Sequence, residues 1–176
     1  MHSRTGVAGL LPLRHLGSTH PTPHGLRAAW ALAFHGTFEH TLDAKNRLTV
    51  PSRFRSALAG RVFLVKGQDP CLSLYPADTY EAMANAALAT ATPMTPQYRE
   101  LSRYFFANAQ ELELDTAGRV MLPANFMAQA GISARELIVA GTGACLELWD
   151  RETWQTYDAE LTQRAPDLTA ALGHPA

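Results

Sequence analysis

The sequence predicts a mixed α+β fold built from two tandem β-β-α-β-β-α units. Two repeated phrases lead to this prediction. The pattern D-x-x-x-R-[hydrophobic]-x-[hydrophobic]-P-x-x-F occurs at 43–54 and again at 115–126. Further along each copy, CLSLYPADTY at 71–80 is matched by CLELWDRETW at 145–154. Because a duplicated unit of this length behaves as one supersecondary module, we expect the two copies to share a single core.

Alternating polarity and turn residues define the elements of the first unit. A turn at Asp43–Asn46 separates the first two strands, and a Gly- and Pro-containing turn separates the last two. Proline suits the first turn of a helix, where its missing N–H would have no partner, so helices are expected at about 51–58 and 76–88. The expected strands are 38–42, 47–50, 62–66 and 71–75.

The second unit repeats this order. Its expected strands are 110–114, 119–122, 136–140 and 145–149, and its expected helices are 123–130 and 150–163. PQYRELSRYFFAN, at 96–108, reads as a connecting helix between the units. The resulting division is an extension at 1–34, a first module at 35–80, a helical connector at 81–107, a second module at 108–151, and a C-terminal helix and tail at 152–176.

The extension at 1–34 has a composition unlike the rest of the chain. It contains three arginines, four histidines and no acid, and Pro, Gly and Ser are frequent. Such a segment buries too little apolar surface to fold. We therefore interpret it as a disordered extension, or as upstream sequence included by the choice of start site.

The turn that begins each repeated phrase has a specific chemistry. In a type I turn closed by a bulge, the fourth residue takes a positive φ, which Asn46 and Gly118 tolerate. The aspartate at the first position can accept hydrogen bonds from backbone N–H groups of its own turn. An arginine follows four residues later in both copies. Spacing alone leaves two interpretations open: the Asp–Arg pairs lock the turns, or they belong to a binding site.

The two copies differ in charge. Residues 44–66 hold six basic side chains and no acid, whereas 116–138 hold two arginines and one glutamate. Residues 147–167 hold six acids and two arginines. A basic hairpin with a short helix favours contact with DNA phosphates, because each contact releases counterions, and a hairpin arginine can reach guanine with two hydrogen bonds. The other interpretation is a cationic face that meets the chain's own acidic helix.

Composition excludes several functional classes. The chain has 176 residues, a net charge of −1 and 18% charged residues, and no apolar run approaches the roughly 18 residues of a membrane span. We expect a soluble cytoplasmic protein. No nucleophile motif, phosphate-binding loop or metal-ligand spacing is found, which predicts no enzymatic activity, no cofactor and no metal. Cys71 and Cys145 are expected to be buried hydrophobes rather than a disulfide.

Taken together, the segments at 36–55, 69–76, 103–109, 114–123 and 145–150 resemble the MraZ family of bacterial transcriptional regulators. The likeness extends from about Phe34 to about Arg164. It implies two SpoVT–AbrB-type modules in a swapped-hairpin barrel, and subunits assembled as a ring-shaped homo-oligomer. It also implies a nucleoid-associated protein that binds double-stranded DNA at short G-rich direct repeats. These repeats lie in the promoter of the division and cell-wall gene cluster, where the family mainly represses transcription, with no membrane and no small-molecule substrate involved.

Residue by residue, the resemblance ties the first D-x-x-x-R to DNA contact. The positions that carry over are Asp43, Lys45 and Arg47 in the hairpin, and Arg53 and Arg55 in the short helix that follows. The second module bears the signature residues Asp115 and Arg119. From the contrast in charge, we predict that the first module carries the DNA face, while the second completes the barrel and the subunit contacts.

Two functions of other classes remain open. The first is an antitoxin-like or scaffolding module whose cationic face binds an acidic protein partner. The second is a small enzyme on a related barrel, which would need a nucleophile or a pair of carboxylates that the sequence does not offer. Salt dependence separates these from DNA binding, which weakens steeply as salt rises.

Overall fold

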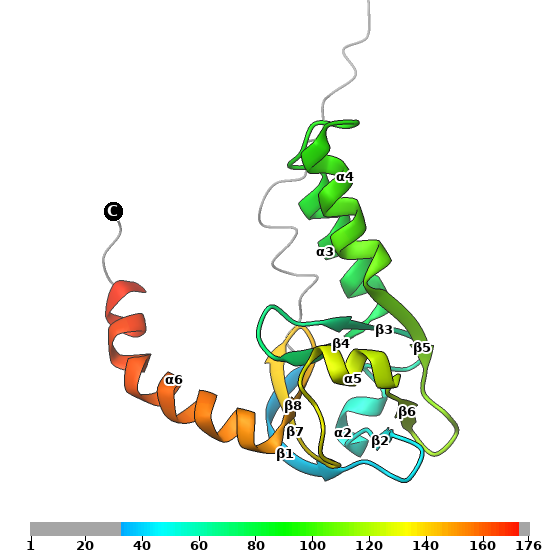
Figure 1. Cartoon of the computed structure of the whole chain (residues 1–176), viewed down its shortest axis with the longest axis vertical. Coiled ribbons are helices and arrows are strands. Elements are labelled where there is room, and N and C mark those ends of the chain that lie inside the picture. Colours follow the sequence, from blue (N-terminus) through cyan, green and yellow to red (C-terminus); the bar gives the residue numbers. More distant parts are fainter. Residues whose placement is uncertain (1–32, 173–176) are drawn as a thin grey trace, which may run out of the picture.

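The computed structural model describes residues 33–172 and shows a β-sheet, a separate two-stranded ribbon and helices that project from them (Figure 1). The first half contains β1 (Phe34–Thr41), β2 (Arg47–Thr49), α2 (Ser52–Arg55), β3 (Arg61–Lys66), β4 (Cys71–Pro76) and α3 (Ala77–Leu88). Helix α4 (Pro96–Ser102) and the π-helical turn η1 (Arg103–Ala107) follow. The second half contains β5 (Ala109–Glu113), β6 (Arg119–Met121), α5 (Ala124–Gln129), β7 (Glu136–Gly143), β8 (Leu146–Asp150) and α6 (Arg151–Leu172).

The two halves exchange strands. In the six-stranded antiparallel sheet the order is β1-β7-β8-β4-β3-β5, so the first strand of each half pairs with a strand of the other half. Strands β2 and β6, again one from each half, pair with each other in a two-stranded sheet, the ribbon. Since the first two strands of each half find their ladder partners in the other half, neither half contains a complete sheet. The mixed α and β class predicted from the sequence is confirmed.

The closed barrel expected from the resemblance is wrong for this chain. Strands β1 and β5 are the two edges of the sheet and do not pair with each other in the described residues. Each already uses one ladder, β1 with β7 and β5 with β3, and the chain then leaves the sheet to form the ribbon. The ribbon covers one face of the open sheet, and the space between them is filled by side chains.

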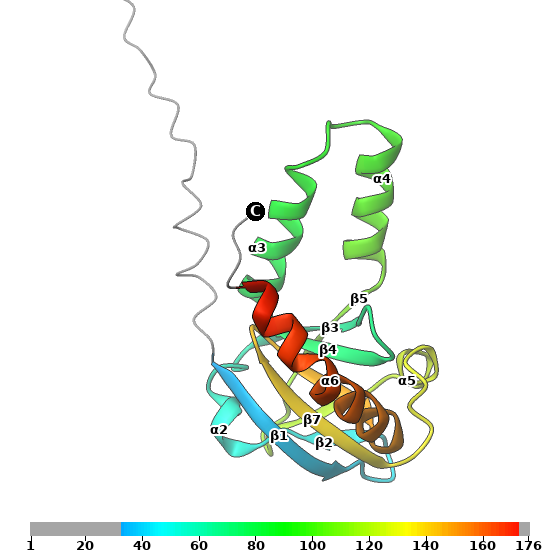
Figure 2. The same ribbon diagram turned by 90° about the vertical axis from the view of Figure 1, so that its left-hand side faces the viewer.

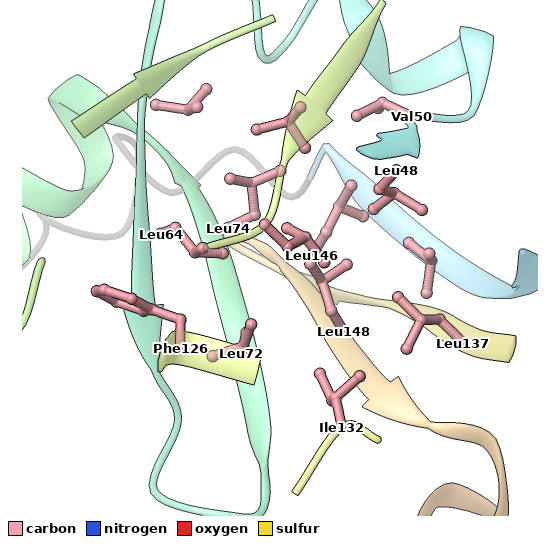
Figure 3. Packing of buried hydrophobic residues seen from close by; sticks show 14 of the residues in the cluster. Leu48, Val50, Leu64, Leu72, Leu74, Phe126, Ile132, Leu137, Leu146 and Leu148 are labelled. Carbon is pink, nitrogen blue, oxygen red and sulfur yellow. The ribbon is translucent and has the colours of Figure 1, made fainter. Parts of the chain in front are cut away.

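That space is the main hydrophobic core (Figure 3). The ribbon contributes Leu48 and Val120, both fully buried, and Figure 3 shows Leu48 directed toward the leucines of the sheet. Phe54 of α2 and Phe126 of α5 belong to the same cluster. Strands β4 and β8 supply Leu72, Leu74, Leu146 and Leu148. The repeated pattern of the two phrases therefore has one cause, since its apolar positions from both halves fill one core.

The other face of the sheet is covered only in part. Helix α6 lies on it through Trp154 and Tyr157, which pack against Trp149. Helix α3 lies on it through Tyr80, whose ring contacts Tyr75. Beyond these contacts α3 and α4 project as an antiparallel pair (Figure 2), and α6 runs away from the sheet (Figure 1). Of the aromatic residues at matched positions of the two copies, Tyr80 and Trp149 are buried, whereas Tyr75 and Trp154 are half-buried. Both cysteines are buried and form no disulfide, as predicted.

Several boundaries differ from the sequence prediction. Strand β1 begins at Phe34, which is buried opposite Gly143, so Phe34 belongs to the sheet and not to the predicted extension. The remainder of that extension, 1–32, and the end of the tail, 173–176, lie outside the described residues. The predicted connecting helix at 96–108 is α4 followed by the π-helical turn.

The last helix is longer than expected. It was predicted to end near residue 163, but α6 continues to Leu172 with Pro166 in its interior. At the start of α6, Asp150 accepts hydrogen bonds from the N–H groups of Glu152 and Thr153, which is the role of an N-cap. None of the helices within 33–172 has the length and apolar character needed to cross a bilayer.

The core between the ribbon and the sheet yields a stability prediction. Leu48→Ala should lower the free energy of unfolding by about 2–5 kcal/mol, because it leaves a cavity beneath the ribbon. Met121→Ala is the control on the same ribbon, since Met121 is 56% exposed, and it should stay within about 0.5 kcal/mol. Denaturant titration followed by circular dichroism measures both. Equal effects of the two substitutions would show that the ribbon is not packed as described.

Candidate nucleic-acid interface

The outer face of the ribbon combines residues of both repeated phrases. In the β2–β6 register Leu48 lies opposite Val120, and these two side chains point into the core. The flanking residues therefore point outward, since neighbours along a strand alternate between faces. Arg47 is paired with Met121, and Thr49 with Arg119. Arg47 and Arg119 are consequently diagonal neighbours on one surface, which we call the ribbon face (Arg47, Thr49, Arg119 and Met121).

The first turn holds Arg47 in place. One carboxylate oxygen of Asp43 accepts the backbone N–H groups of Lys45 and Arg47, at 2.8 and 3.0 Å. The other oxygen accepts Nε of Arg47 at 2.6 Å. Asn46 has a φ of 55°, as the turn prediction requires. The turn is also tied to the second half, because the Asn46 carbonyl accepts the N–H of Leu122 at 2.9 Å.

The second turn has the same geometry. Asp115 accepts the backbone N–H groups of Ala117 and Arg119, both at 2.9 Å, and Nε of Arg119 at 2.8 Å. Gly118 has a φ of 73°, and its carbonyl accepts the N–H of Val50 from the first half at 2.9 Å. The two turns therefore stand at opposite ends of the ribbon, each bonded to the half of the chain that does not contain it.

The interpretation that the Asp–Arg pairs lock their turns is confirmed, and the interpretation that they belong to a binding site stays a prediction. The carboxylates lock the turns, but they engage only Nε of each guanidinium. The terminal nitrogens of Arg47 and Arg119 form no hydrogen bond or ion pair within residues 33–172, and the two side chains are 30% and 33% exposed. Each aspartate thus fixes its arginine in orientation while leaving the two-pronged end of the guanidinium available. This is the fork that binds phosphates and guanine edges.

The hydrogen bonds also shift the acidity of the aspartates. Donation by the backbone N–H of Arg47, and then by that of Lys45 and by the guanidinium, lowers the pKa of Asp43 from its ordinary value near 3.8 to about 2. The pKa of Asp115 is lowered for the same reason, with the Arg119 backbone N–H as the largest cause. Both carboxylates are therefore charged at neutral pH and hold their arginines by charge-assisted hydrogen bonds.

The remaining predicted site residues are not gathered at one point. Lys45 is exposed in the first turn, beside Arg47. Arg53 lies on α2, with its guanidinium over the rings of Phe38 and Phe54, 5.6 and 5.3 Å from their centroids. These contacts place Arg53 against β1 and α2 rather than on the ribbon.

Arg55 makes contacts within the fold that link the two halves of the chain. Its Nε donates to the carbonyl of Val50 at 2.9 Å, and its side chain crosses the backbone of Gly118, so closely that a Cβ there would overlap the guanidinium. An arginine of the first half thus clamps the turn of the second half. Of the five DNA-binding positions carried over by resemblance, the structure brings Asp43, Lys45 and Arg47 together and uses Arg55 to connect the halves.

Both signature arginines stand on the ribbon face, one from each half of the chain. The assignment of the DNA contact to the first module stays a prediction. Sequence reasoning also missed Thr49 and Met121, which complete that face. The alternation R-L-T and R-V-M contained the signal that these positions share a side with the arginines. What the alternation could not show is that β2 and β6 pair with each other.

Comparison with known proteins identifies relatives along nearly the whole described region. The family model described as "MraZ protein, putative antitoxin-like" matches the chain twice, at residues 33–103 and 105–172. A protein of Thermomicrobium roseum named "Transcriptional regulator MraZ" is 37% identical over 79% of this chain and 96% of its own length. Proteins of the same name from Thermobifida fusca and Rhodococcus jostii are 40% and 41% identical, over 77% and 70% of this chain and 93% and 85% of their own lengths.

The contact between Arg55 and Gly118 can be tested with a matched pair of glycines. Gly118 and Gly131 have nearly equal φ values, 73° and 71°, but a Cβ at Gly131 would meet nothing within 4 Å. Gly131→Ala should cost only the left-handed backbone penalty, about 1–2 kcal/mol of unfolding free energy. Gly118→Ala should cost more, because Arg55 must also move. Chemical denaturation measures both, and equal costs would mean that the Arg55 contact contributes nothing.

The lowered pKa of Asp43 gives a pH prediction. A folded-state pKa of about 2 against an ordinary value near 3.8 means that the carboxylate's contribution to stability is complete above about pH 4 and is lost as pH falls toward 2. Carboxyl NMR of the folded protein should show Asp43 titrating near 2. Asp43→Asn should flatten the fall of stability across this window. A titration midpoint of Asp43 near 3.8 would contradict the turn geometry.

Proposed function

Because the chain belongs to the MraZ family, we propose that it is a transcriptional regulator that binds duplex DNA through its ribbon face. The observation that carries this proposal is the pair of outward guanidinium ends, Arg47 and Arg119, on one two-stranded ribbon. A two-stranded ribbon fits the major groove of B-DNA, where a guanidinium can donate two hydrogen bonds to guanine O6 and N7. Arginines that donate to guanine favour G-rich sites, and we propose short G-rich direct repeats as the target.

The two ends of the ribbon contribute unequally. At the first turn, exposed Lys45 adds a second positive charge beside Arg47. At the second turn, the matching position is Ala117, which adds none. The basic first module therefore remains the stronger contact, but the shared face makes the second module part of the reader. In this proposal both modules contact DNA and the first contributes more, whereas the charge contrast alone predicts contact by the first module only.

The charge distribution lets a chain of net charge −1 approach DNA. The ribbon lies on one face of the sheet, whereas α6, which carries Glu152, Asp158, Glu160 and Asp167, packs on the opposite face. The acidic side chains of α6 are thus kept away from the bound duplex. We further propose that subunits assemble as a ring, so that several weak ribbon faces engage successive repeats and bind tightly together by effective concentration.

In this proposal the protein acts mainly as a repressor of the division and cell-wall gene cluster, by occupying repeats in its promoter. The proposal involves no catalysis, cofactor or membrane. An antitoxin-like role, in which the same cationic ribbon binds an acidic protein partner, is the competing function. The antitoxin-like role would use the same ribbon surface, but it predicts no preference for a particular DNA sequence.

The proposal is tested by anisotropy titrations of duplex DNA from the gene's own upstream region. Arg47→Ala should weaken binding by about tenfold or more, because a two-pronged arginine–guanine contact is worth about 1–3 kcal/mol. Arg119→Ala should weaken it in the same direction and by less. Arg99→Ala is the charge-matched control, since Arg99 lies on α4 in the projecting helical pair, and should leave the affinity unchanged.

Salt dependence and assembly complete the test. Losing a phosphate contact should reduce the slope of log affinity against log salt by about one, and light scattering should show that all variants keep the native assembly. If the native protein shows no preference for its own promoter DNA, the regulator proposal fails and an acidic protein partner becomes the better candidate. If Arg119→Ala binds like the native protein while Arg47→Ala does not, only the first module reads DNA.

A further inference from the structure

The sheet face opposite the ribbon contains a cleft of about 890 Å³. It lies between the centre of the sheet, at β4 and β8, and the base of the helical pair, at α3 and η1. Its floor follows from strand alternation: Leu72 and Leu74 point into the core, so Ser73 and Tyr75 point into the cleft. The volume is typical of small-molecule sites. Nothing in the proposed DNA contact uses this cleft.

A carboxylate stands at the middle of the cleft floor. Glu147 of β8 is directly opposite Ser73 of β4 in the sheet register. One of its oxygens accepts the indole N–H of Trp149 at 3.0 Å. The other oxygen has no hydrogen bond, and no basic side chain pairs with Glu147, within residues 33–172. Burial raises the pKa of Glu147, and nearby Asp69 raises it further. Glu147 is thus a half-buried carboxylate without the basic partner that normally accompanies a charge removed from water.

Aromatic side chains form the wall beside this carboxylate. Four aromatic side chains line the cleft, and each ring contacts the next in the order Tyr75, Tyr80, Phe105 and Tyr104. The hydroxyl of Tyr80 donates to the carbonyl of Phe105 at 2.6 Å, which fixes η1 against α3. The aromatic wall is therefore held in place by the fold itself. Aromatic faces beside a carboxylate attract organic cations, through the ring quadrupole and through charge.

The charges that line the cleft are unbalanced. Asp69 and Glu147 are acidic, and Lys66 is the one basic side chain among the lining residues. Lys66 lies at the exposed end of β3 and forms no ion pair in the part of the chain that the structure describes. The cysteines do not alter this balance, because burial raises the pKa of the Cys71 thiol to about 12 and keeps it neutral.

We propose that this cleft binds an organic cation, an ammonium or guanidinium group on a hydrocarbon stem, with Glu147 as its counter-ion and the tyrosine wall around its stem. Two sources supply this chemistry. One is a free small molecule, which would make the cleft an effector site on the face away from DNA. The other is a lysine or arginine side chain from a second copy of this chain.

The test uses agmatine, which carries a guanidinium and an ammonium on a four-carbon stem, and its uncharged analogue N-butylurea. Isothermal titration of the native protein should detect agmatine binding and no binding of N-butylurea. Glu147→Gln keeps the shape of the side chain and an oxygen for Trp149, and should weaken agmatine binding at least tenfold. Glu113→Gln, at an exposed glutamate on β5 outside the cleft, should bind agmatine like the native protein.

Light scattering of the same variants distinguishes the two sources. A smaller assembly for Glu147→Gln, with native size for Glu113→Gln, would show that a neighbouring copy supplies the cation. Agmatine binding with unchanged assembly would show a free ligand. The inference is overturned if agmatine does not bind and Glu147→Gln assembles like the native protein. Where Glu147→Gln keeps the native assembly, promoter DNA affinity should be unchanged, because the ribbon face is untouched. Where the assembly is smaller, promoter DNA affinity should fall with the number of linked ribbon faces, whereas a single ribbon face is unaltered.

Discussion

The pairing of β2 with β6 is the constraint on which the rest of the structure depends. It requires the first hairpin of each half to reach across to the other half, and this places β1 beside β7 and β5 beside β3. It buries Leu48 and Val120 from opposite halves in the same core. It also brings two arginines that are far apart in the sequence to one surface. The fold and the candidate site therefore both depend on this one strand pairing.

Local order was largely predictable from the sequence. Turn residues with a tolerance for positive φ, and prolines at helix starts, located the turns at Asn46 and Gly118 and the helices α2, α3 and α5. Their determinants lie within a few residues of one another. The length of α6 was not predicted, since the helix continues past residue 163 and through Pro166 to Leu172.

Long-range order was not predictable in the same way. The sequence identifies which residues repeat, but not which strand of one repeat faces which strand of the other. The contrast in charge between the copies does not reveal that Arg47 and Arg119 lie on one surface. Nor does it reveal that Arg55 donates to a carbonyl five residues back and packs against a glycine in the other half. Counting charges along a chain cannot distinguish a free guanidinium from one that is already occupied.

The clamp of Arg55 over Gly118 has a consequence for how the two repeats can change. In a symmetric dimer of identical hairpins, one residue would have to serve at both equivalent places. Here the position equivalent to Arg55 is the core residue Met127, and the position equivalent to Gly118 is Asn46. Because both copies lie in one chain, equivalent positions can carry different residues, and each half can fit the other with residues of its own. Arg55 and Gly118 should accordingly be replaced together, because a change at either position alone alters the contact between them.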